Sequence, residues 1–304
     1  MVDWNERRQA KLPDGQKSLL PVDFRVPVLS QVIVEFSRKA DDPNVKSKEL
    51  AQIIETDSGL TFELLKYVNS SAVGLRHKAT TVFQALTLLG VRQAHLHLLT
   101  FVVQQSTSAS KSKLIDSMEF WDTNLDRALF ARAIAKHLGA DADIAYTGGM
   151  LQDFLLPELT CRFEDLYTDY LDQKESAHGD LASFELETAG WNHAREGARL
   201  LISWGFPDEL VYCVFCHHES YETLTDEELS STAGAVTMSA MLPGPLRQVP
   251  AGPEYLFELE RRLPEFQLLD VAAQVDQQFE ELSSRTTNRR SLHNRIQEIL
   301  QPAG

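Results

Sequence analysis

Apolar residues along this chain recur three and four positions apart, and few windows alternate apolar and polar residues over five or more positions. The first spacing is typical of an amphipathic helix, and alternation is typical of a strand. Near the start of the chain, for example, Val28, Leu29, Val32, Ile33 and Phe36 fall on one face of a helix. The pattern therefore predicts an all-α protein.

Five short helices are predicted in the first third of the chain. Short helices are marginal alone, so these need one another to bury their apolar faces. Thr81 is expected to cap the fourth helix and Gly90 to separate it from the fifth. We expect one compact helical lobe over residues 20–106, after an N-terminal extension over residues 1–19. The helices are predicted at Pro27 to Ala40, from Ser47 to the segment TDSG, and at Leu60 to Asn69, Val82 to Leu89 and Val91 to Gln104.

A polar segment, STSASKSK at Ser106 to Lys113, is typical of a linker and precedes a second helical lobe over residues 114–242. A segment rich in proline and glycine then leads to a C-terminal helical extension over residues 253–304. Gly139 is expected to end the first long helix of the lobe. The predicted helices are Ser117 to Leu138, Asp143 to Leu156, Phe163 to Ser176, Asp180 to Ala189, His193 to Trp204, Pro207 to His218, Asp226 to Met241, Tyr255 to Leu263 and Leu268 to Leu300.

Charge and hydropathy exclude several classes of protein. The net charge of −15 opposes binding to a phosphate backbone, and the Lys and Arg residues form no strong basic patch, so no nucleic-acid partner is expected. The N-terminus is polar and lacks the apolar run of a signal peptide. No stretch approaches the roughly 18 apolar residues of a membrane span, so no membrane partner is expected. We therefore expect a cytoplasmic protein.

The segment CVFCHHE, from Cys213 to Glu219, resembles two cofactor signatures at once. Its CxxCH pattern is that of c-type haem attachment, but that modification occurs on exported chains. Its two thiols and one histidine would give zinc three ligands on one helix face, whereas a closed structural site uses four. Only Cys161 remains as a further thiol. We therefore expect Cys213 and Cys216 to be buried packing residues, and no cofactor.

Four polar residues of the second lobe, two of them in CVFCHHE, could share one pocket: Asp153, His193, His217 and His218. Imidazole nitrogens and carboxylate oxygens suit first-row divalent ions, and helical bundles build such sites from facing helices. A single buried histidine, however, is more often a hydrogen-bonded core residue than a ligand. The residues alone leave both interpretations open.

Several motifs together resemble the HDOD domain proteins, a bacterial family of signalling modules related to the HD and HD-GYP phosphohydrolases. The resemblance covers about Leu20 to Leu242. It rests on ELAQIIETDSGLTFELLKYVNSS and TTVFQALTLLGVRQAHLHLL in the first lobe, and on AYTGGMLQDFLL, HAREGARLLISWGFPDEL and HHE in the second. It implies an all-α fold of two helical lobes, the second derived from the HD hydrolase core.

The resemblance also implies which metal ligands have been lost. The first ligand position of catalytic HD relatives corresponds to Thr123, the histidine of their His-Asp pair to Gln152, and their late aspartate to a position near Ala240. Asp153, His193, His217 and His218 match. Hydroxyl and amide oxygens are weak ligands and a methyl group is none, so we expect a vestigial pocket with no bound metal and no catalytic residues. The GYP sequence of the cyclic-di-GMP phosphodiesterases is also missing after HHE.

The sequence thus predicts a non-enzymatic, stand-alone signalling or regulatory module that acts through protein partners. Two alternatives stay open: a residual metal-dependent phosphohydrolase acting on a nucleotide or cyclic dinucleotide, and a sensor that binds a small phosphorylated ligand in the pocket. An apolar stripe in the C-terminal extension could pack on the chain's own core or form a homodimer contact. The stripe consists of Leu268, Leu269, Ala272, Val275 and Phe279.

Overall fold

The computed structural model describes most of the chain, and its regular structure there is helical. The described residues are 2–22, 24, 28–40, 42, 44–70, 73, 78–107, 111–173, 179–219, 224–262, 266–282 and 289–300. No strand occurs among them. The predicted all-α class is confirmed.

The chain divides into two compact units. The smaller comprises residues 26–109 and 280–284, and the larger comprises residues 1–25, 110–279 and 285–304. The linker predicted over residues 106–113 contains this boundary, although residues 106 and 107 still belong to a helix. The terminal segments that we predicted as extensions belong to the larger unit, except residues 280–284, which belong to the smaller unit.

In the smaller unit, five of the described helices form a bundle in which their apolar faces meet, as the periodicity predicts. Its core contains Ile33, Phe36, Leu50 and Leu64, all fully buried. The hydroxyl of Thr81 accepts a hydrogen bond from the Gln84 amide at 3.2 Å, which confirms the predicted cap. The first helix begins later than predicted, and Pro27 lies outside the described residues. The helices are α2 (Gln31–Ala40), α3 (Ser47–Ile54), α4 (Ser58–Val68), α5 (Val82–Leu89) and α6 (Val91–Thr107).

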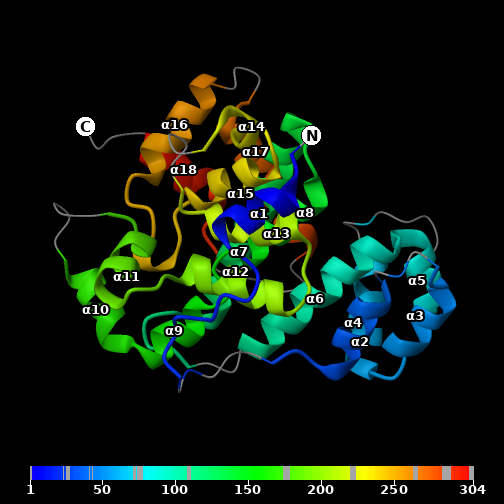
Figure 1. The fold of residues 1–304 in the computed structure, drawn as a ribbon. Helices are drawn as coiled ribbons and strands as arrows, with labels where there is room; N and C mark the ends of the chain where they lie inside the picture. The colour runs from blue at the N-terminus through cyan, green and yellow to red at the C-terminus, as the bar shows by residue number, and fades with distance from the viewer. Residues whose placement is uncertain are drawn as a thin grey trace. The chain divides into compact units, whose positions relative to one another are not determined.

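The core of the larger unit is built from α7, α8, α13 and α15, which pack on one another, while α12 packs on α13 (Figure 1). Helices α7 and α8 approach closely because Gly149 has no side chain: a Cβ there would lie 2.8 Å from the Ala128 Cα. Gly139 ends α7 in the left-handed conformation, as predicted. These helices span α7 (Ser117–Leu138), α8 (Ala142–Leu151), α12 (His193–Ser203), α13 (Asp208–Cys216) and α15 (Thr232–Ala240).

The remaining described helices of the larger unit cover this core. Two of them, α17 and α18, replace the single helix predicted from residue 268 to residue 300, and residues 283–288 between them lie outside the described part of the chain. These helices are α1 (Trp4–Lys11), α9 (Leu156–Arg162), α10 (Glu164–Asp172), α11 (Leu181–Ala189), α14 (Asp226–Leu229), the 3₁₀ turn η1 (Pro245–Arg247), α16 (Gly252–Arg262), α17 (Leu268–Leu282) and α18 (Leu292–Leu300).

Two predicted helices end earlier than expected, and candidate site residues follow the end of each. The helix predicted from residue 143 to 156 ends at Leu151, and α9 begins after an intervening turn that contains Asp153. Pro157 explains the break, because it has no N–H to donate to the carbonyl four residues earlier. Likewise α13 ends at Cys216, so His217 and His218 follow the helix. The sequence pattern placed these residues on helices, and the structure places them in turns at helix ends.

The N-terminal segment contains a helix that the sequence analysis missed. Helix α1 packs on α13, where the rings of Trp4 and Tyr212 lie 5.6 Å apart. The Arg8 side chain is 6% exposed and its Nε donates to Asp208 at 2.7 Å. The helix is almost entirely polar, so it lacks the apolar periodicity by which helices are recognised.

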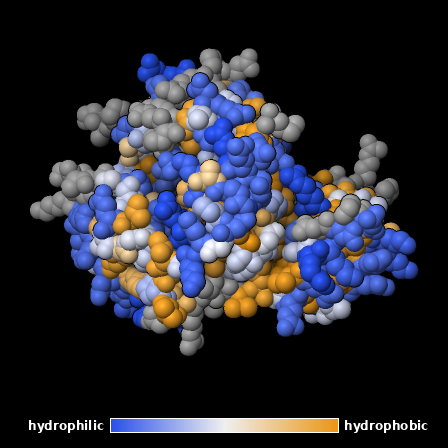
Figure 2. Space-filling model, in the orientation of Figure 1, coloured by the Kyte–Doolittle hydropathy of each residue, from blue (hydrophilic) through white to orange (hydrophobic). Residues whose placement is uncertain are grey.

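The apolar stripe of α17 is buried within the chain itself. Leu268, Ala272, Val275 and Phe279 are each at most 2% exposed. Four of the five stripe residues thus pack inside the chain, and Leu269 is partly exposed. A homodimer contact through the C-terminal helices stays a prediction. The face of the molecule in Figure 2 is largely hydrophilic, with apolar side chains in small groups.

None of the described helices is by itself long and apolar enough to cross a membrane. Helices α5 and α6 are long and apolar enough only when taken together, and the chain bends by 113° between them.

Candidate functional site: a buried carboxylate and three histidines

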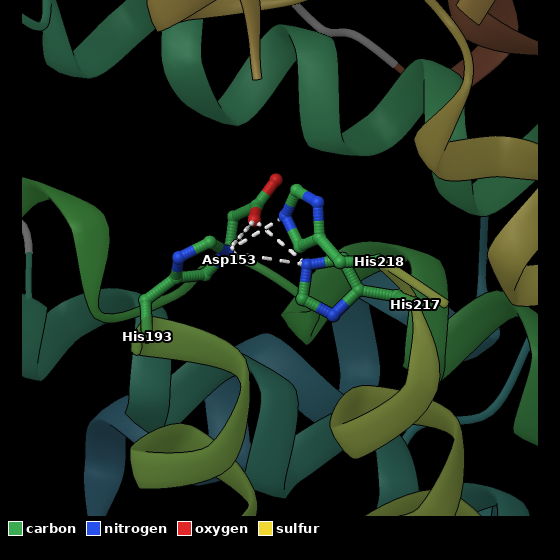
Figure 3. Close-up of side chains that lie close together, drawn as sticks. All are labelled: Asp153, His193, His217 and His218. Carbon is green, nitrogen blue, oxygen red and sulfur yellow. Dashed lines mark hydrogen bonds and ion pairs between the residues drawn. The ribbon is translucent and has the colours of Figure 1, made fainter. Parts of the chain in front are cut away.

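The four residues that the sequence singled out converge in the interior of the larger unit (Figure 3). One potential ligand atom from each lies within 4.8 Å of the others. The Nε2 atoms of His193 and His217 each lie 3.2 Å from Asp153 Oδ1, and 3.3 Å from one another. The Nε2 of His218 lies 3.0 Å from that of His193. The structure thus brings these four residues together in one buried cluster.

Hydrogen bonds on the outer side of two imidazoles fix which nitrogen faces the centre. The Nδ1 of His217 lies 2.7 Å from the Val214 carbonyl oxygen, to which it can only donate. The Nδ1 of His193 lies 2.6 Å from the Glu185 carboxylate and donates to it in the same way. In their neutral forms both rings therefore direct a lone pair toward Asp153 Oδ1. Three acceptors thus meet at one point.

Glu185 is itself held by a second buried residue. Its other oxygen accepts a hydrogen bond from the hydroxyl of Tyr167 at 2.6 Å, and the His193 amide donates to the first oxygen at 2.8 Å. Burial and the Glu185 charge raise the pKa of Tyr167 well above its usual value, so it stays a donor. A carboxylate that orients a histidine from behind is the outer support that metal-bound histidines use.

The second oxygen of Asp153 points away from the imidazoles (Figure 3) and pairs with the guanidinium of Arg127. Both side chains are buried, at 1% exposure for Arg127 and none for Asp153. Burial alone would disfavour the Asp153 charge, but Arg127 and the two imidazoles outweigh it and hold the pKa of Asp153 well below its usual range. Asp153 is therefore ionised at every physiological pH.

The protonation states of the histidines follow from the same charges. Burial opposes a charge on His193, but Glu185 and Asp153 outweigh it and raise the pKa of His193 to about 10. Burial and repulsion from the other two histidines lower the pKa of His218 well below its usual value. Without an ion, one proton on His193 supplies the donor that the three acceptors require.

The donor set also fits one divalent metal ion. Zinc binds imidazole and carboxylate at about 2.0–2.2 Å, so neighbouring ligand atoms of a tetrahedral site lie roughly 3.4 Å apart. Four of the six separations among these ligand atoms, at 3.0, 3.2, 3.2 and 3.3 Å, come close to that value, and all six lie within 4.8 Å. Asp153, His193, His217 and His218 would hold the ion.

The positions that the resemblance assigns to lost ligands are buried but offer little to a second ion. Thr123 lies on α7 and Ala240 ends α15, with exposures of 7% and 2%. Gln152 is 1% exposed, and its amide oxygen can accept from Arg127 at 3.3 Å. The Asp153 oxygen on this side of the site already pairs with Arg127.

The two thiols of CVFCHHE belong to the core, as predicted. Cys213 and Cys216 are at most 1% exposed, and Cys161 is exposed. Burial raises the pKa of both thiols, to about 12 for Cys216. Within the described part of the chain, the cluster of potential ligands around Asp153 includes no thiol.

One pocket borders the site on the His218 side. Its wall includes polar side chains from α11, the start of α12 and the end of α13, among them Asp180, Asn192 and Arg195. The Nδ1 of His218 lies 3.6 Å from Asp180. A small polar molecule in this pocket would therefore touch one of the four residues of the site.

Sequence reasoning missed Arg127 and Glu185, both central to the site. A signal was present: each is a charged residue at the helical spacing of buried positions, Arg127 between Thr123 and Ala131, and Glu185 after Leu181 and Ala182. Charged residues at core spacing are almost never buried unless they are paired. That signal cannot identify the partner.

Comparison with known proteins agrees with this fold. The family model of the HDOD domain matches residues 26–220, more than half of the chain, so the chain belongs to the HDOD family. A curated relative from Treponema pallidum (strain Nichols), named an uncharacterized protein, is 26% identical over 271 residues. That match covers 84% of this chain and 50% of the relative, so the chain spans about half the length of the relative.

Solved structures of several bacterial proteins show a similar fold. A candidate phosphohydrolase from Shewanella amazonensis SB2B is similar with a TM-score of 0.63 and 18% identity, over 91% of this chain and 95% of its own. An HDOD domain protein of unknown function from Geobacter sulfurreducens gives a TM-score of 0.61 and 16% identity, over 90% and 93%. A candidate signal transduction protein from Marinobacter aquaeolei VT8 gives 0.57 and 17%, over 98% and 64%.

Proposed function

We propose that this HDOD protein is a non-enzymatic regulatory module that acts in the cytoplasm through contacts with protein partners. Membership of the HDOD family and the likeness to a candidate signal transduction protein support a regulatory role. The observation that carries the non-enzymatic part is the ligand set: Thr123, Gln152 and Ala240 stand where the resemblance places further metal ligands. Two-metal hydrolysis needs a second ion to clamp the attacking and leaving oxygens.

Partner capture from the source organism tests the regulatory part. The protein and a variant that carries both Asp153→Ala and His217→Ala are used as baits under identical conditions. If regulation works through protein contacts alone, both baits retain the same specific partner, provided that the variant is folded by circular dichroism. Loss of the partner from the folded variant would instead place the site at the centre of the function.

A second candidate function is a residual phosphohydrolase that uses one ion. The convergence of Asp153, His193, His217 and His218 favours it, because these residues fit one divalent ion. When bound, such an ion lowers the pKa of a coordinated water and polarises a phosphoryl oxygen. Elemental analysis of protein purified without chelator tests it. Less than about 0.1 ion of manganese, iron or zinc per chain would contradict this candidate.

A further inference from the structure

The buried guanidinium of Arg127 is a charged group at this centre that the proposed function does not use. Arg127 lies in the interior of α7 and is 1% exposed. Burial lowers its pKa although Asp153 opposes that shift, and an arginine keeps its charge in proteins in any case. A buried cation of this kind is retained only where it is paired, since removing an unpaired charge from water is unfavourable.

Arg127 is enclosed by acceptors on several sides. Asp153 Oδ2 pairs with Nη1, the Leu242 carbonyl accepts from Nη2 at 3.4 Å, and the Gln152 amide oxygen, facing the guanidinium, accepts from Nη1 and Nε at 3.3 Å. Gly244 completes the cavity, because a Cβ there would lie 2.7 Å from Nη2. Both the acceptors and the glycine fit a planar guanidinium.

Asp153 thus lies between two positions for a cation. Oδ1 faces the imidazole nitrogens, where one proton or one metal ion is accommodated, and Oδ2 faces Arg127. Two of the lost-ligand positions adjoin the guanidinium. Gln152 contacts it directly, and Thr123 lies one turn earlier on α7.

We infer that Arg127 is a built-in cation that takes the place of a second metal ion at this centre. It neutralises Asp153 from the side opposite the imidazoles, limits the centre to one divalent ion per chain, and weakens the binding of that ion by sharing the carboxylate. The inference goes beyond the proposed function and holds whether or not the chain hydrolyses a phosphoester, so the two fail separately.

Zinc binding to three proteins tests it. Isothermal titration with Zn²⁺ compares the wild type, Arg127→Met and Arg132→Met. Arg132 is the matched control, an arginine on the same helix whose Nη2 donates to Gln278 rather than to Asp153. We expect Arg127→Met to bind one Zn²⁺ at least about tenfold more tightly than the wild type, because a repelling charge beside the ion is removed. Arg132→Met should bind as the wild type does.

Equal zinc affinity of Arg127→Met and the wild type would overturn the inference, as would two zinc ions in the wild type. If Arg127→Met folds only with zinc present, the ion has replaced the missing cation, which supports the inference. Arg127→Lys provides an independent test should Arg127→Met not fold at all. It keeps the charge, so its zinc affinity should stay within about threefold of the wild type, and a tenfold rise would contradict the role of the charge.

Discussion

The Nε2 atoms of His193 and His217 lie 3.3 Å apart, and the Nδ1 atom of each ring donates away from the centre. Two lone pairs at this distance repel one another unless a proton or a metal ion lies between or beside them. Because the pKa of His193 is raised to about 10, its ring carries the required proton in the ion-free protein. The same arrangement would suit one metal ion, because Glu185 holds the His193 ring with its Nε2 atom facing the centre.

Replacing Glu185 by glutamine should weaken zinc binding about 10- to 100-fold, because the carboxylate that orients and polarises His193 is lost. Glu187→Gln is the matched control, since Glu187 lies on the same helix, is exposed, and should leave the affinity unchanged. Isothermal titration with Zn²⁺ measures both. Equal affinity of the two variants would show that Glu185 only fills space.

The three thiols should differ sharply in reactivity. At pH 8, Ellman's reagent is expected to modify one thiol per native chain, at Cys161, and all three after denaturation. Cys213 and Cys216 are shielded by burial, which also raises the pKa of each thiol and so suppresses the reactive thiolate. Cys161→Ser should abolish the native reaction. Fast modification of two or more thiols in the native wild type would contradict the buried position of α13.

The N-terminal helix should stabilise the larger unit. Arg8→Met removes a buried guanidinium that donates to Asp208, and we expect the free energy of unfolding to fall by about 1–3 kcal/mol. Urea denaturation measures the change. Lys11→Met is the matched control, because Lys11 lies exposed on the same helix and its replacement should change the stability by less than about 0.5 kcal/mol. Equal stability of both variants would mean that α1 contributes little.

The sequence predicted the helices best where periodicity, caps and glycines agree. The helix ended by Gly139 and the cap at Thr81 are examples, because local chemistry determines both. The four site residues could be listed from the sequence because histidine and aspartate are conspicuous among apolar residues. The turn position of Asp153 could not be predicted, because Pro157 acts on a residue four positions earlier, and apolar spacing does not reveal that. The position of His217 and His218 after the end of α13 was missed as well.

The rest of the site depends on contacts between distant segments. Arg127 meets Asp153 and the Leu242 carbonyl across 26 and 115 positions of the chain. Glu185 reaches both Tyr167 and His193. Pairings at such distances arise from helix packing, whereas sequence patterns report mainly local structure. The polar α1 was missed for a related reason, since it is held by ion pairs and one aromatic contact rather than by an apolar face.

The most direct test of the central claim is the turnover of phosphodiesters by protein loaded with Mn²⁺. The wild type and Asp153→Ala are incubated with bis(p-nitrophenyl) phosphate and with cyclic di-GMP, and product is followed against a blank that contains Mn²⁺ alone. A non-enzymatic module predicts that both proteins give the rate of the blank. Metal-dependent turnover by the wild type that Asp153→Ala abolishes would contradict the account.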